Sequence, residues 1–233
     1  MIQNLETNKE RKFMDMKKKR ENYQLFLLGI FLIVWIWAAI NPITREGWLN
    51  ENYVVFIGVP FLIFLIRYFK LSNLSVTFIT IFMVLHVIAS HYTYLKVPFG
   101  FYIQNILGVE RNMYDRFMHL LFGALMIFPI REAFMKLSKS KGFWTYYLPI
   151  DMILACSAFF EILELCVVLF IRPEATASFM GFQNDFWDAT KDMLNAFIGA
   201  LVTISIIFII NISRHRQARK ELKKSFAIKN KNL

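Results

Sequence analysis

This sequence has few cysteines and no recognisable nucleotide-binding motif. Its 233 residues include two cysteines, Cys156 and Cys166, ten positions apart. Because ten residues of helix rise about 15 Å, these thiols cannot bond to each other and are expected to pack as small apolar groups. No GxGxxG pattern, P-loop, internal repeat or low-complexity tract occurs. The sequence therefore gives no support for a dinucleotide site, a nucleoside triphosphate site or a repeat fold.

Apolar residues dominate instead: 57% of the chain is hydrophobic, 25 residues are Phe, and the mean hydropathy is +0.44. That composition is too apolar for a soluble domain of this size and predicts an all-α, polytopic membrane protein. Six apolar segments approach the length of about 20 residues that a spanning helix needs: Gln24–Ile40, Tyr53–Phe69, Leu71–Ser90, Phe117–Ile130, Tyr147–Ile171 and Leu194–Ile212. The fourth segment is short. Because the long side chains of Arg116 and Arg131 at its ends can extend to the membrane surface, we expect the helix to continue beyond its apolar residues.

The distribution of basic residues predicts the topology. With six spans and an inside N-terminus, 21 of the 27 Lys and Arg residues lie inside and six lie outside, as the positive-inside rule requires. We therefore expect both termini in the cytoplasm, with a basic tail over residues 1–23, a membrane domain over 24–212 and a second basic tail over 213–233. The basic run Lys17–Arg20 precedes the first span, and we expect this span to be an uncleaved membrane anchor. The tails are expected to contact anionic membrane lipids, not nucleic acid.

An acidic stripe begins the last span. Asp185, Asp188, Asp192 and Asn195 are spaced 3, 4 and 3 residues apart, which are the intervals of one helix face. Charge at membrane depth is costly unless it is paired, hydrated or bound, so these residues are candidates for function. A simpler interpretation of Asp185 and Asp188 is that they are N-terminal carboxylates favoured by the helix dipole.

The predicted topology brings further polar residues to the same outer third of the bilayer. They come from the ends of the third, fourth and fifth spans: His86, His91, Tyr92, Tyr94, Asp115, Arg116, His119, Glu161 and Glu164. Histidine with several carboxylates suits a divalent cation such as zinc, manganese or iron. We expect metal ligands among His91, His119, Glu161, Glu164, Asp185, Asp188 and Asp192. Without a metal, the paired glutamates could carry protons.

Each of these residues also has a structural interpretation. His86 fits a core or interfacial histidine, and His91-Tyr92-Thr93-Tyr94 fits an aromatic belt at the membrane surface. His119 with Asp115 could be a structural hydrogen-bonded pair. The charged pair Arg131-Glu132, on the inner side, fits a role in topology.

Several motifs together resemble a known family. His91-Tyr92-Thr93-Tyr94, Tyr114-Asp115-Arg116 with His119, Glu161 with Glu164, and Asp185-Phe186-Trp187-Asp188 with Lys191-Asp192 resemble the YjdF-like family of bacterial inner-membrane proteins over roughly residues 25–212. This resemblance implies the fold and the location but no mechanism. A fainter likeness, in the Asp-Arg-x-x-His start of one helix and the acidic-Asn pattern of the last, is to VanZ-like membrane proteins.

Three functions are consistent with these features. The first is a metal or headgroup site with hydrolase-like chemistry on a lipid-linked or phosphate-bearing substrate. Its acid–base groups would be Asp115, His119, Glu161, Glu164 and Asp192. The residues that bind its substrate would be Arg116, Lys191, Asn195, Tyr92 and Tyr94. The second is a small cation or proton transporter, which the apolar inner halves of the spans disfavour. The third is a non-catalytic protein that binds lipid or a partner. The sequence alone does not decide whether the protein is an enzyme.

Overall fold

The computed structural model describes residues 2–170, 185–214, 219–221 and 223–224, and within these ranges it is all helical. The predicted outer connection that begins at Arg172 and most of the C-terminal tail lie outside the described residues. The long helices are α1 (Ile2–Ala39), α2 (Arg45–Tyr68), α3 (Asn73–Tyr92), α5 (Tyr114–Leu137), α6 (Trp144–Phe170) and α8 (Asp188–Arg214).

Four of these helices are long and apolar enough to cross a membrane by length and composition: α1 from Glu10, α2, α3 and α8. The fourth predicted span belongs to α5, which begins before Arg116 and ends after Arg131. At 24 residues it rises about 36 Å, so the expectation that this helix extends beyond its apolar core is confirmed. The chain is a multi-pass membrane protein.

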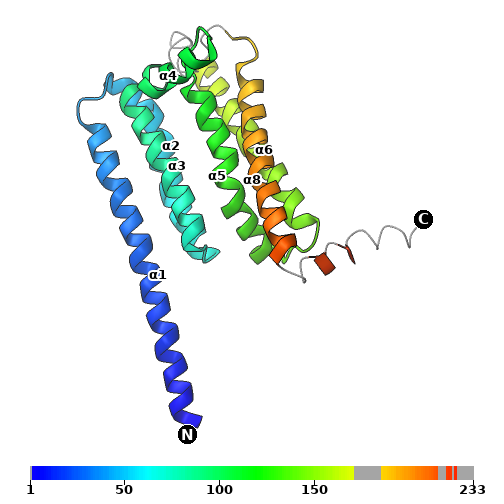
Figure 1. Cartoon of the computed structure of the whole chain (residues 1–233). Helices are drawn as coiled ribbons and strands as arrows, with labels where there is room; N and C mark the ends of the chain where they lie inside the picture. The colour runs from blue at the N-terminus through cyan, green and yellow to red at the C-terminus, as the bar shows by residue number, and fades with distance from the viewer. Residues whose placement is uncertain (1, 171–184, 215–218, 222, 225–233) are drawn as a thin grey trace.

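The helices pass up and down through one bundle (Figure 1). In this view α8 ends at the lower end of the bundle, α1 begins well below it, and α5 and α8 both begin at the upper end. The main hydrophobic core contains side chains from all six long helices, including Phe31, Val87, Ile127, Ile153 and Ala200.

Helices α5 and α8 run parallel and approach closely through small residues. A Cβ atom added to Gly123 would lie 1.8 Å from the carbonyl oxygen of Ala196, and one added to Gly199 would lie 2.1 Å from that of Leu120. Helix backbones in membranes approach this closely only where side chains are small. Because the helices are parallel, the residues one turn before this contact also face each other. Those residues are His119 and Asp192.

A short helix missing from the sequence-based prediction covers the upper end of the bundle. After a 3₁₀ turn at Tyr94–Lys96, α4 (Pro98–Leu107) lies across the tops of the long helices (Figure 1). Asn112 holds it in place, because its side chain donates to the carbonyl of Val97 at 3.0 Å and accepts from the backbone N–H of Tyr114 at 3.0 Å. This helix lies in the connection between the third and fourth predicted spans.

Candidate functional site

The centre of the site lies between α5, α6 and α8. One ligand atom from each of Asp115, His119 and Asp192 lies within 4.8 Å of the others. His119 and Asp192 are buried, and the Asp115 side chain is 13% exposed. The approach of His119 to Asp192 joins ligand atoms from α5 and α8. It follows directly from the parallel contact of α5 and α8, because each residue precedes that contact by one turn.

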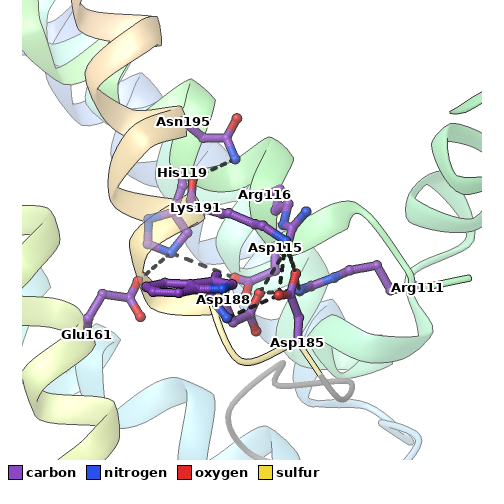
Figure 2. A network of polar contacts seen from close by, with 10 residues as sticks. Arg111, Asp115, Arg116, His119, Glu161, Asp185, Asp188, Lys191 and Asn195 are labelled. Atoms are coloured by element: carbon purple, nitrogen blue, oxygen red, sulfur yellow. Dashed lines mark hydrogen bonds and ion pairs between the residues drawn. The ribbon is translucent and has the colours of Figure 1, made fainter. Parts of the chain in front are cut away.

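Helix α6 supplies the fourth group. Glu161 Oε1 lies 3.3 Å from His119 Nε2, while Asp115 Oδ1 is 3.9 Å from the same nitrogen. Figure 2 shows His119 between Glu161 and the other carboxylates. An imidazole nitrogen among carboxylates can donate a hydrogen bond to one of them or bind a cation together with them.

The other ring nitrogen of His119 has its own partner. Ser157 Oγ lies 3.4 Å from His119 Nδ1, and Ser157 is almost fully buried. A group that binds the second nitrogen fixes the orientation of a metal-binding imidazole. Sequence analysis missed Ser157. The available signal was its position four residues before Glu161, which places both on one face of α6.

Buried carboxylate oxygens that accept no hydrogen bond add to the concentration of negative charge at this centre. Asp192 Oδ1 and Glu161 Oε1 are buried and accept no hydrogen bond within the described part of the chain. A buried carboxylate without a donor costs free energy unless it is protonated or bound to a cation. Three carboxylates around one histidine therefore favour protonation of a carboxyl group or a bound cation.

A second set of charges adjoins this centre, at the beginning of α5 and α8 and in the connections before them (Figure 2). Asp188 and Asp185 form ion pairs with Arg111 and Arg116, respectively, and Arg116 also lies 3.4 Å from Asp188. Lys191 Nζ donates to Asp185 at 2.7 Å. The hydrogen bonds from Lys191 and Arg116 hold the pKa of Asp185 well below its ordinary value. Both aspartates are therefore neutralised by cationic side chains.

Several residues expected at the site from the sequence lie elsewhere. His91 stacks on Trp37 with ring centroids 4.6 Å apart, and its Nδ1 is 3.2 Å from the carbonyl oxygen of Ala38. Tyr92 packs edge-on against His91. The hydroxyl of Tyr94 is 2.6 Å from His86 Nδ1. These side chains form the packing between α1, α3 and the upper loop, and Tyr94 also lies within electrostatic range of Asp115 and Glu164.

Two expected residues lie beside the centre without joining it. Asn195 donates to the backbone carbonyl of Lys191 at 2.9 Å, a contact within one helix. Glu164, one turn beyond Glu161, lies within electrostatic range of Asp115, Glu161 and Asp192. It does not belong to the set of three ligand atoms described above.

The comparisons with known proteins agree with this fold. The model of a predicted membrane protein family, DUF2238, matches residues 23–213. The chain belongs to this family. It is similar to the inner membrane protein YjdF of Escherichia coli (strain K12), with 32% identity over 173 residues, which cover 74% of this chain and 82% of the relative. The resemblance to the YjdF-like family is confirmed. No solved structure matches the chain.

The different positions of Glu161 and Glu164 lead to a paired prediction. We expect Glu161→Gln to weaken cation binding strongly, because its carboxylate faces the nitrogen that would bind the cation. Glu164→Gln should weaken it only slightly, through the loss of a nearby negative charge. Titration of each chelator-treated variant with zinc and manganese measures the two affinities. Equal losses in both variants would contradict the placement of Glu161 against His119.

Proposed function

We propose that this protein binds one divalent cation through His119, Asp115 and Asp192, with Glu161 as a fourth ligand or a base. The observation that carries the proposal is the convergence of these ligand atoms within 4.8 Å of one another. One imidazole with carboxylate oxygens suits zinc, manganese or iron better than magnesium or calcium, which prefer oxygen alone. The cation would balance the buried carboxylates that lack other partners.

The chemistry supported best is hydrolysis of a lipid-linked or phosphate-bearing substrate at the outer leaflet. A bound divalent cation supplies an activated water and polarises a phosphoryl oxygen. Glu161 Oε1 lies 3.3 Å from His119 Nε2, and this carboxylate would be the group that accepts a proton in such a hydrolysis. Arg116 and Lys191, directly above, have the charge to hold a substrate phosphate.

A non-catalytic role in binding lipid or a partner is the second candidate, and one observation favours it. Arg116 and Lys191 are both engaged by Asp185. A phosphate group could reach them only by replacing that carboxylate. In this alternative the charged network holds the outer ends of α5 and α8 together, and the cation below it has a structural role.

Thermal melting with added metal tests the proposal. Chelator-treated protein in detergent should melt higher after zinc or manganese is added, by on the order of 5–10 °C at a hundredfold excess over the dissociation constant. His91→Gln is the matched control, because it removes a histidine that contacts Trp37 and lies apart from the centre. It should retain the full metal-induced rise. No rise in the wild-type protein with any divalent cation would refute the proposed site.

We further propose six spans with both termini in the cytoplasm of the inner membrane. The excess of Lys and Arg in the predicted inside segments and the common end of the first and last helices (Figure 1) support this topology. The E. coli relative is an inner membrane protein by name.

Cysteine labelling measures this topology. With both native cysteines replaced by serine, a cysteine at position 225 should react with an impermeant maleimide only after the cells are opened. A cysteine at position 102, on exposed α4, should react in intact cells. The reverse pattern would place Asp115, His119 and Asp192, the carboxylate–histidine centre, on the cytoplasmic side.

A further inference from the structure

The opposite end of the bundle contains a cavity with basic walls. It has a volume of about 560 Å³ and is lined by Arg20, Tyr68, Phe69, Lys70, Lys136 and Leu137. These residues come from α1, from the end of α2 with the turn after it, and from the end of α5. Among the described residues that line it there are three basic side chains and no carboxylate. Its charge therefore favours an anionic ligand.

Two of the three basic groups are available to a ligand. Lys136 is engaged, because its Nζ donates to the carbonyl of Lys70 at 2.7 Å and to Glu132 at 2.6 Å. Within the described ranges, Arg20 and Lys70 have no ion-pair partner. Arg20 Nε is buried and has no hydrogen-bond partner there. Because Arg20 as a whole is only partly buried, a phosphate would bind the accessible part of its guanidinium group.

An apolar groove continues from this cavity along α2. It has a volume of about 520 Å³ and is lined by Pro60, Ile63, Phe64, Arg67 and Tyr68. Tyr68 lines both spaces, so the basic cavity and the groove adjoin. Phe64 is 57% exposed and stacks on Tyr68 with ring centroids 5.7 Å apart. A basic cavity next to an apolar groove matches the two parts of a phospholipid, its charged headgroup and its acyl chain.

We propose that this pair of spaces binds one anionic phospholipid, with the headgroup phosphate between Arg20 and Lys70 and an acyl chain along the groove beside Phe64. Basic pockets between membrane helices recognise anionic headgroups in this way. With the termini in the cytoplasm, as proposed above, the lipid belongs to the inner leaflet. The site is independent of the carboxylate–histidine centre. Within the protein, α1 packs mainly against α3. The bound lipid would connect α1 to the ends of α2 and α5.

Native mass spectrometry of the full chain with phosphatidylglycerol or phosphatidylcholine tests the proposal. One phosphatidylglycerol molecule should remain bound under conditions that remove phosphatidylcholine. Arg20→Gln and Lys70→Gln should each weaken its retention by about fivefold, the effect of one basic residue near an anionic surface. Lys19→Gln is the matched charge control, because it removes an exposed positive charge one residue away, about 100° around α1. It should leave retention unchanged.

The groove has its own matched pair. Phe64→Ala should reduce retention of phosphatidylglycerol severalfold, whereas Phe61→Ala should not, although both side chains are 57% exposed on α2. Inorganic phosphate at millimolar concentration should not displace the lipid. Displacement by phosphate, equal retention of the two lipids, or equal effects of Arg20→Gln and Lys19→Gln would each overturn the proposal.

Discussion

Gly123→Ala is expected to lower the melting temperature in detergent by on the order of 5–10 °C. The added Cβ would lie 1.8 Å from the carbonyl oxygen of Ala196 and 2.8 Å from the amide nitrogen of Ala200. These are backbone atoms of α8 and cannot rotate away. The helices must therefore separate, at a cost of about 2–3 kcal/mol for overpacking of this kind.

Gly29→Ala is the matched control for this prediction. It makes the same change within a membrane helix, but nothing lies within 4 Å of its added Cβ. Alanine favours a helix over glycine by up to about 1 kcal/mol, so this variant should melt at the same temperature or slightly higher. The Gly123 variant gains the same helix propensity, and the difference between the two isolates the contact of α5 with α8. Similar melting of both variants would show that this contact is not close.

Asp192→Asn is expected to have opposite effects with and without metal. In metal-free protein the change removes one of several buried carboxylates that crowd His119. Its loss relieves repulsion or, where the acid is protonated, leaves the net charge unchanged. The variant should therefore melt at or above the temperature of metal-free wild type. With zinc or manganese present the order should reverse, because a ligand is missing.

The metal affinity itself should fall by more than about 100-fold, since even groups that only support a ligand contribute 10–100-fold. The test needs four melting temperatures, those of the wild type and of Asp192→Asn, each measured with chelator and with metal. Asp151→Asn is the control, because Asp151 is an exposed carboxylate at the other end of α6. It should leave the metal-dependent rise unchanged. If Asp192→Asn lowered the melting temperature equally in both conditions, Asp192 would have a packing role without a metal.

Helical periodicity and the positions of basic residues predicted much of this arrangement. The spacing of the acidic stripe correctly placed Asp188, Asp192 and Asn195 along α8, although Asp185 precedes this helix. The order of the spans brought His119 and Glu161 to the same end. These predictions depend on geometry within one helix and on the direction of each span, which local sequence determines.

Contacts made by the upper loops could not be predicted in the same way. The sequence placed Asp185 and Asp188 with the metal ligands, whereas the structure pairs them with Arg116 and Arg111. Arg111 lies in the connection before α5, and its direction depends on α4, which neither length nor hydropathy had indicated. His91 likewise has the right chemistry at the right depth, but its position on α3 faces Trp37 of α1.

The metal content of protein purified without chelator tests the central claim most directly. Elemental analysis should find about one zinc, manganese or iron per chain in the wild type, since the centre offers one imidazole and up to three carboxylates to a single cation. Asp192→Asn and His119→Gln, purified in parallel and folded by the same melting criterion, should retain less than about a tenth of that amount. Metal-free wild-type protein, or equal metal in all three proteins, would contradict a cation site at Asp115, His119 and Asp192.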